Sequence, residues 1–181
     1  MNRIPPVDRT TATGPTGELL DTVQRAFGKV PNGIEVLANA PAALEAWWAF
    51  ELAIDGSRLP RPVQEQIALL SANYNSCGYC LSAHTAAARA VGVSPEDLAA
   101  AKVAEASDPF AASVLALASA VLTHRGDVPD DVLADARGGG LTDADILDTV
   151  ALLAINAFSN YYNRLAHTAL DYPPAEFAEA S

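Results

Sequence analysis

Apolar residues recur every three or four positions along most of this chain, the spacing that gathers them on one face of an α-helix. The segments with this spacing begin at residues that favour helix starts, and several end at glycine or before proline. The predicted helices begin at or near Thr16, Pro41, Pro60, Cys77, Ser94, Asp108, Pro129 and Thr142. No stretch combines polar and apolar alternation with the β-branched residues of a strand. The pattern therefore predicts an all-α fold.

The segments between these helices define the expected domain organisation. Residues 1–15 contain three prolines and a glycine and are expected to form an extended N-terminal arm. Residues 30–33 read as a turn, and the three glycines at 138–140 as a flexible linker. The paired prolines after residue 172 are expected to end the ordered part and leave a C-terminal tail, 173–181. We therefore predict a single helical domain over residues 16–172.

Two segments of the chain repeat one another at an offset of 83 residues. Residues 68–85 and 151–168 share nine identities in 18 positions without a gap, including asparagine, tyrosine, histidine and threonine in register. We infer two copies of one helical hairpin, around 65–85 and 148–168, packed about a local pseudo-two-fold axis. The second copy has Asn160 and Asn163 where the first has cysteines, so we expect these amides to hold hydrogen bonds in the thiol positions, and His167 to hydrogen-bond in the core.

The charge and the terminal sequences narrow the classes of partner. The 181 residues include 11 Lys and Arg against 22 Asp and Glu, a net charge of −11, which disfavours nucleic acid and anionic membrane surfaces. No apolar run reaches the ~18 residues of a membrane helix, and no secretory signal is visible. We expect a cytoplasmic protein. The glycines at 138–140 lack the strand and helix context of a phosphate loop, and no other nucleotide or flavin motif is present, so no cofactor is predicted.

Both cysteines of the chain lie in one Cys-x-x-Cys motif, which in a cytosolic chain suggests redox or metal chemistry. Cys77, Cys80 and His84 share one face of a helix, and residues three apart are close enough for a disulfide. The helix start at Cys77 favours the thiolate form, and His84 is placed to take the proton of Cys80. Glu65, 12 residues before Cys77, is the candidate carboxylate to orient His84.

The spacing of Glu65, Cys77, Cys80 and His84 resembles the signature of the alkylhydroperoxidase D-like (AhpD-like) proteins of the carboxymuconolactone decarboxylase superfamily. The segments around 30–41 and 163–166 also resemble its peroxidase-related members, so the likeness covers roughly residues 25–170. It implies an all-helical bundle, assembly into dimers, trimers or hexamers, and thiol-dependent peroxide reduction. It further implies that Cys80 attacks the peroxide, Cys77 resolves the product as a disulfide, and Glu65 with His84 relays protons.

The resemblance has one departure, between the two cysteines. The best-known peroxidase members carry a histidine there, whereas this chain has Gly78 and Tyr79. The strength of the peroxidase activity and the identity of the reductant therefore stay open, as does whether Tyr79 lines the pocket or only packs. The expected reductant is a dithiol, either a lipoyl-type group or a thioredoxin-like protein.

Three other functions remain open at this point. A carboxymuconolactone decarboxylase-like lyase on the same scaffold would not generally depend on a Cys-x-x-Cys. A non-enzymatic redox sensor would use the same disulfide but would not turn over. A zinc site could draw on Cys77, Cys80, His84 and Glu65, although structural zinc sites usually pair two separated ligand clusters. The preferred prediction is a thiol-dependent oxidoreductase that reduces hydroperoxides.

Overall fold

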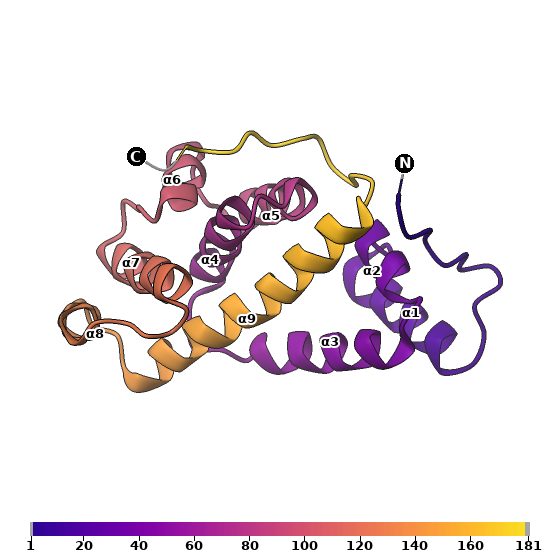
Figure 1. Cartoon of the computed structure of the whole chain (residues 1–181), viewed down its shortest axis with the longest axis horizontal. Coiled ribbons are helices and arrows are strands. Elements are labelled where there is room, and N and C mark those ends of the chain that lie inside the picture. Colours follow the sequence, from indigo (N-terminus) through magenta and orange to yellow (C-terminus); the bar gives the residue numbers. More distant parts are fainter. Residues whose placement is uncertain (1, 180–181) are drawn as a thin grey trace.

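The computed structural model describes residues 2–179, and in that range it contains nine α-helices, one 3₁₀ helix and no strand, so the predicted all-α fold is confirmed (Figure 1). The helices are α1 (Gly14–Phe27), α2 (Asn32–Leu37), α3 (Pro41–Ile54), α4 (Arg61–Tyr74), α5 (Gly78–Ala90), α6 (Pro95–Ala100), η1 (Ala101–Val103), α7 (Pro109–His124), α8 (Asp130–Gly138) and α9 (Asp143–Ala166).

Helix α4 lies at the centre of the fold. Every residue from 63 to 72 is buried, which is the pattern of a helix surrounded by others on all sides. It packs against α5, α7, α9 and η1. Figure 1 shows α9 crossing the molecule diagonally, with α7 and α8 at one end and α1 and α2 at the other. The dithiol motif lies where α4 turns into α5, so it is held by the most buried part of the fold.

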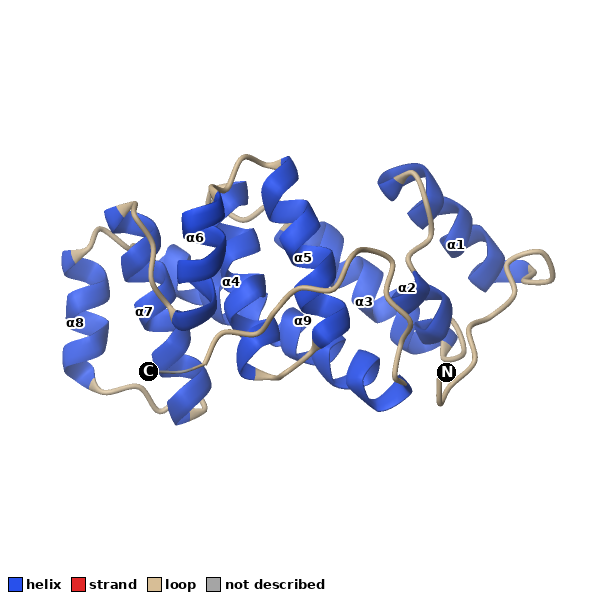
Figure 2. Ribbon diagram, turned by 90° about the horizontal axis from the view of Figure 1, so that it is seen from above, coloured by secondary structure: helices blue, strands red, loops and turns tan. Residues whose placement is uncertain are grey.

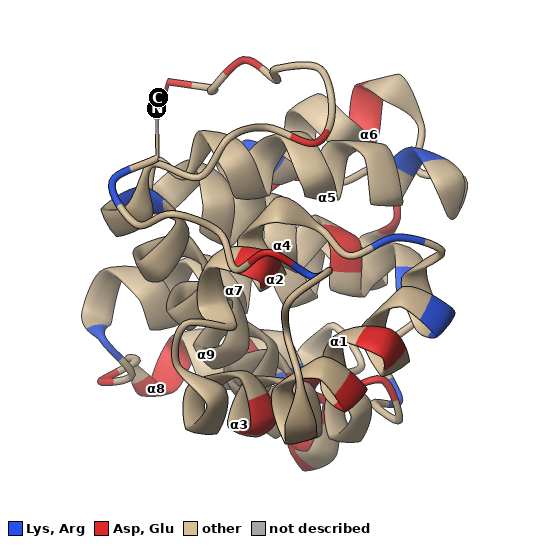
Figure 3. Ribbon diagram, turned by 90° about the vertical axis from the view of Figure 1, so that its right-hand side faces the viewer, with Lys and Arg blue, Asp and Glu red and all other residues tan. Residues whose placement is uncertain are grey.

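The core consists of two apolar clusters. The larger joins α4, α5, α7 and α9, and the smaller is built by α1, α2 and α3 around Leu20, Val23 and Leu44. Trp47 on α3 packs against both clusters and so connects them. Figure 3, seen from the end of the molecule that carries α1 and α2, shows acidic positions on α1, α3 and α8. None of the described helices combines the length and apolar character needed to cross a bilayer.

Several predicted helix starts coincide with side-chain caps. The hydroxyls of Ser94 and Thr142 and the carboxylate of Asp108 each accept the backbone N–H three residues later. Thr142 and Asp145 form a reciprocal capping box at the start of α9. At the other end of α1, Gly28 takes the left-handed conformation (φ 75°) that terminates a helix. These local signals are strong enough to be read from the sequence.

Two predicted boundaries in the N-terminal half are wrong. Helix α1 begins at Gly14 rather than at Thr16, because Pro15 fits the first turn of a helix. The segment predicted as a turn at 30–33 enters helix α2 at Asn32, with Pro31 as its extended N-cap. The buried side chains of α2 belong to the smaller core cluster, so tertiary packing stabilises a helix of only six residues.

The prediction that the sequence repeat forms two helical hairpins is also wrong. The first copy is a hairpin, because Ser76 adopts a left-handed conformation (φ 54°) and Cys77 caps a new helix. The second copy lies within α9 up to Ala166, in a single helix of 24 residues that continues through the aligned position Ser159. Equal residues at Ser76 and Ser159 therefore take different backbone conformations.

The residues after α9 lie against the helices without forming one. Figure 2 shows this C-terminal segment crossing the molecule from the end of α9 towards α6. Asn73 and Ala178 exchange two hydrogen bonds of 3.1 and 2.9 Å, and Lys102 donates to the carbonyl of Glu176 at 2.7 Å. Ser82 on α5 donates to the carbonyl of Pro173 at 3.0 Å. The segment is thus held against α4, α5 and η1 as far as Ala178.

Candidate active site

The two cysteines stand at the start of α5. Cys77 is the N-cap residue, and its Sγ accepts the backbone N–H of Cys80 at 3.2 Å. Both thiols are free, with exposed fractions of 0% for Cys77 and 4% for Cys80. A cap position next to unpaired N–H groups favours a thiolate. The local fold therefore presents Cys77 to the positive end of the helix.

The two thiols have different proton affinities. The hydrogen bond from Cys80 lowers the pKa of Cys77, as do the charges of His84 and Arg164, and together they outweigh the opposing effect of burial. The same hydrogen bond raises the pKa of Cys80, and burial adds to this. Of the two thiols, Cys77 is therefore the one that loses its proton more readily.

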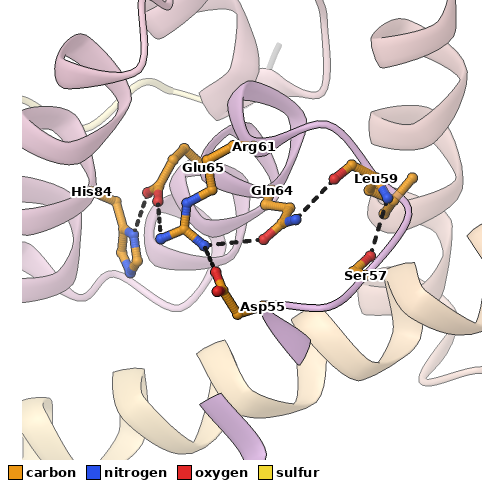
Figure 4. A network of polar contacts seen from close by, with 7 residues as sticks. All are labelled: Asp55, Ser57, Leu59, Arg61, Gln64, Glu65 and His84. Carbon is orange, nitrogen blue, oxygen red and sulfur yellow. Dashed lines mark hydrogen bonds and ion pairs between the residues drawn. The ribbon is translucent and has the colours of Figure 1, made fainter. Parts of the chain in front are cut away.

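Glu65 and His84 meet as the sequence predicts. Glu65 Oε2 lies 2.9 Å from His84 Nδ1, and Glu65 Oε1 lies 3.3 Å from the guanidinium of Arg61 (Figure 4). The Glu65 side chain is only 6% exposed. Burial opposes its charged form, but the hydrogen bond with His84 and the charges of His84 and Arg61 lower its pKa overall. Burial would lower the pKa of His84, but Glu65 raises it above its ordinary value.

A cavity of about 330 Å³ opens on one side of this group. Cys80, His84 and Glu65 line it, whereas Cys77 does not. Five aromatic residues, Phe27, Trp47, Tyr79, Tyr162 and Tyr172, contribute to its other walls together with aliphatic and polar residues. A molecule in the cavity would therefore meet Cys80 first, beside the Glu65–His84 pair.

The asparagines of the second copy hold hydrogen bonds around the thiols, as predicted. Asn160 Oδ1 accepts from Ser71 Oγ and from Asn75 Nδ2, each at 2.9 Å. Asn163 Nδ2 donates to the carbonyl of Ser159 at 2.9 Å and lies 3.8 Å from Cys80 Sγ. Contacts with Asn160 and Asn163 lower the pKa of Cys80, against the larger effects of Cys77 and burial.

Tyr79, between the cysteines, both lines the cavity and anchors the motif. Its hydroxyl donates to Asp171 Oδ2 at 2.6 Å and accepts the backbone N–H of Gly33 at 2.9 Å. Asp171 also accepts from the backbone of Asn32 at 2.9 Å and pairs with Lys29 at 3.4 Å. The dithiol hairpin is thereby joined to α2 and to the C-terminal segment, through partners that no sequence motif indicates.

The residues aligned with Glu65 and His84 in the second copy do not form a second pair. Asp148, aligned with Glu65, accepts from Ser57 Oγ at 2.8 Å and so holds the loop between α3 and α4. The prediction that His167 hydrogen-bonds in the core is wrong, because His167 is exposed in a left-handed conformation (φ 53°) just after α9. Between residues 2 and 179, no three His, Cys, Asp or Glu side chains are grouped to hold a metal ion.

The cavity contains one further acidic residue, Glu51, that no sequence motif predicts. Glu51 lies one turn after Trp47 on α3, and both side chains line the cavity. Burial raises the pKa of Glu51, against the charges of His84 and Arg61, which lower it. The signal in the sequence is only the four-residue spacing from Trp47, which places the two on one helix face.

Comparison with known proteins identifies a family and a relative that this chain resembles. Residues 41–121 match the Carboxymuconolactone decarboxylase family. Over 94 residues the chain is 33% identical to Alkyl hydroperoxide reductase Rv2159c of Mycobacterium tuberculosis, a match that spans 51% of this chain but only 27% of that protein.

Solved structures share the fold over nearly the whole chain. A peroxidase-related protein with an alkylhydroperoxidase AhpD core from Ralstonia eutropha JMP134 superposes with a TM-score of 0.83 at 24% identity, covering 94% of this chain and 92% of that one. The debrominase Bmp8, in complex with 2,3,4-tribromopyrrole, superposes with a TM-score of 0.77 at 20% identity, covering 93% and 91%.

Proposed function

We propose that the chain is an AhpD-like protein of the carboxymuconolactone decarboxylase superfamily and a thiol-dependent oxidoreductase that reduces organic hydroperoxides. One observation carries the proposal. Cys80 lines a cavity of about 330 Å³ with five aromatic wall residues beside the Glu65–His84 pair, while Cys77 is fully buried outside this cavity and accepts the backbone N–H of Cys80. Such a cavity suits a substrate with an apolar body.

The proposed reaction uses the two thiols in turn. Cys80 Sγ attacks the terminal oxygen of the hydroperoxide while its proton passes to the Cys77 thiolate. The O–O bond breaks, Cys80 becomes a sulfenic acid, and an alkoxide leaves. Cys77 Sγ then attacks Cys80 Sγ, and the hydroxyl departs as water with the Cys77 proton, which His84 transfers with Glu65 holding its charge. The alkoxide takes one proton from an acid of the cavity, so that one thiol, one thiolate, one hydroperoxide and this proton give a disulfide, an alcohol and water.

A dithiol must then reduce the disulfide by exchange. We propose a lipoyl-type dithiol or a thioredoxin-like protein as reductant, since the chain shows no motif for a nucleotide or flavin. Exchange returns one proton to Cys80 and one to the acids of the cavity, which closes the cycle. A free dithiol of this kind suits a reducing compartment such as the cytoplasm.

We also propose that the protein works as a homo-oligomer. Leu52 on α3 and Leu147 on α9 are 59% and 67% exposed, and Val150, also on α9, is 40% exposed. The hydrogen bond from Ser57 to Asp148 holds the end of α3 beside this part of α9. Large apolar side chains gathered in this way are typical of a surface that another subunit covers.

A second candidate function uses the same dithiol on a halogenated aromatic ring. The aromatic walls of the cavity favour it, and one solved structure with this fold is a debrominase. Two thiols and an aryl bromide would give the debrominated ring, bromide, a proton and the disulfide. The lyase alternative makes no use of the paired thiols, and the sensor alternative predicts one oxidation without turnover.

The test is consumption of cumene hydroperoxide with dihydrolipoamide as reductant, comparing the unmodified protein with Cys80→Ser. Sustained turnover that Cys80→Ser abolishes is the expected result. Formation of one disulfide per chain followed by arrest would favour the sensor. A Cys80→Ser protein as active as the unmodified one would show that the site is assigned wrongly, and release of bromide from a bromopyrrole without peroxide turnover would favour the second candidate.

A further inference from the structure

The alkoxide that leaves a hydroperoxide is a strong base and needs a proton inside the cavity. Within residues 2–179, the side chain of Glu51 makes no hydrogen bond or ion pair, although it lines the cavity together with Cys80 and His84. Glu51 lies on α3, which is not one of the two helices, α4 and α5, that form the dithiol hairpin. Glu51 therefore faces the space that a substrate would occupy, with its carboxyl oxygens unused by the protein.

Glu65, the other carboxyl of the cavity, is fully engaged. One of its oxygens is held by His84 at 2.9 Å and the other by Arg61 at 3.3 Å. These partners keep Glu65 ionised, whereas burial favours the protonated form of Glu51. Two carboxyls of one site whose environments push their proton affinities apart are the usual arrangement of a charged residue and an acid. The geometry separates the roles in the same way, since only Glu51 presents free oxygens.

The charged and titratable groups around Glu51 come from four elements. His84 on α5 and Arg61 on α4 favour its ionised form, and Glu65 on α4 and Asp55 after α3 favour its protonated form. Tyr162 on α9 faces the same space, and its own pKa is raised by burial and by the charges of Cys80, Cys77 and Glu51. Tyr162 thus stays neutral, which leaves Glu51 as the stronger acid of the two.

We propose that Glu51 is the general acid that protonates the leaving alkoxide, and this inference rests on the proposed function of the same site. As Cys80 Sγ bonds to the terminal oxygen and the O–O bond breaks, the carboxylic acid of Glu51 gives its proton to the departing oxygen. The products are the alcohol, the Cys80 sulfenic acid and the Glu51 carboxylate. The dithiol that later reduces the disulfide supplies the proton that restores Glu51, so protons and electrons balance over the cycle.

This assignment separates substrates by their leaving groups. An alkyl hydroperoxide expels an alkoxide, which requires an acid, whereas a peroxy acid expels a carboxylate, which does not. General acid catalysis contributes about 100-fold or more for a basic leaving group. Replacing Glu51 should therefore slow the first substrate class selectively.

The experiment is single-turnover oxidation of the reduced protein, freed of reductant, by tert-butyl hydroperoxide and by peracetic acid. Disulfide formation is followed by acid quench and labelling of the remaining thiols. We expect Glu51→Gln to slow oxidation by tert-butyl hydroperoxide about 100-fold and oxidation by peracetic acid by no more than about threefold. Glu45→Gln, an exposed glutamate on the same helix, should slow neither.

Peracetic acid also reports on folding, because a damaged cavity would slow both reagents. Equal losses with both, or no loss with either, would overturn the role of Glu51. If Tyr162→Phe rather than Glu51→Gln discriminates between the reagents, the tyrosine is the acid and the inference is wrong. If neither reagent oxidises the unmodified protein, the proposed function itself fails and this inference fails with it.

Discussion

Asn163 points its side-chain amide at Cys80 Sγ from 3.8 Å, and these two residues occupy the same position in the two copies of the sequence repeat. The second copy thus contributes to the site by direct contact with the first. The side-chain amide of Asn163 favours the thiolate form of Cys80, the residue aligned with it, because it places a hydrogen-bond donor near that sulfur.

Removing this amide should make Cys80 harder to ionise. In a Cys77→Ser background, where Cys80 is the one remaining thiol, Asn163→Ala should slow alkylation by iodoacetamide about tenfold at neutral pH, the effect of one lost hydrogen bond to a charged group. The rate measured against pH should shift to higher pH. Asn156→Ala is the control, because Asn156 lines the cavity on the same helix but donates to the carbonyl of Leu152. Equal profiles for the two variants would contradict the role of Asn163.

Gly33 has no room for a side chain. A methyl group there would lie 2.8 Å from Asn163 Oδ1 and 3.0 Å from the Tyr79 ring. Gly33→Ala should therefore lower the free energy of unfolding by about 1–3 kcal/mol and slow oxidation of the dithiol. Gly138→Ala, also helical but with open space around it, should be neutral or stabilising by about 0.5 kcal/mol. Urea denaturation of both variants checks this, and a neutral Gly33→Ala would refute the close packing.

Tyr79→Phe should loosen the C-terminal segment. The change leaves Asp171 and the N–H of Gly33 without their hydroxyl partner, at a cost of about 1–3 kcal/mol. Amide hydrogen exchange should rise in residues 171–178 and in α2, with α7 and α8 unchanged. Unaltered exchange in the C-terminal segment would mean that its other hydrogen bonds suffice.

The Glu65–His84 pair predicts a window of pH in which it stabilises the fold. The lowered pKa of Glu65 contributes stability above about pH 4.3, and this is lost as the pH falls through the folded pKa. The raised pKa of His84 contributes stability below about pH 6.5, and this is lost as the pH rises through the folded pKa. Glu65→Gln should therefore cost most, about 2 kcal/mol, between these two values. Urea denaturation across pH tests this, and a cost that does not vary with pH would exclude the ionic contribution.

The proposed subunit contact predicts a change in mass. Leu147→Glu should shift the protein towards the monomer in sedimentation velocity, because it places a charge in an apolar interface. Ala134→Glu, at an exposed position on α8, should leave the sedimentation coefficient unchanged. A monomeric unmodified protein, or an assembly that survives Leu147→Glu, would contradict this interface.

The features that the sequence predicts well are those set by neighbours along the chain. Caps such as Thr142 and the shared face of Cys80 and His84 follow from local geometry, and the expected contact of Glu65 with His84 is present. Glu51 and Asp171 reach the site only through the packing of α3 and of the C-terminal segment, which no local pattern encodes.

The sequence repeat misled for a related reason. Identical serines at 76 and 159 establish a common pattern but not a common backbone. In the first copy a helix ends just before Ser76 and Cys77 caps a new one, whereas Asn160, aligned with Cys77, lies inside the continuous helix α9. A repeat therefore predicts which residues correspond but not whether each copy bends.

The two tryptophans of the chain are neighbours on α3, with ring centroids 6.0 Å apart, and Trp47 forms part of the cavity wall. Both tryptophan side chains of the protein therefore lie together, beside the cavity that Cys80 lines. Sulfur groups and bound ligands alter the emission of nearby indoles, so fluorescence follows binding, oxidation and reduction in the unlabelled protein. Trp47, which packs against both apolar clusters of the core, is therefore also a fluorescent probe of the reactions at the dithiol.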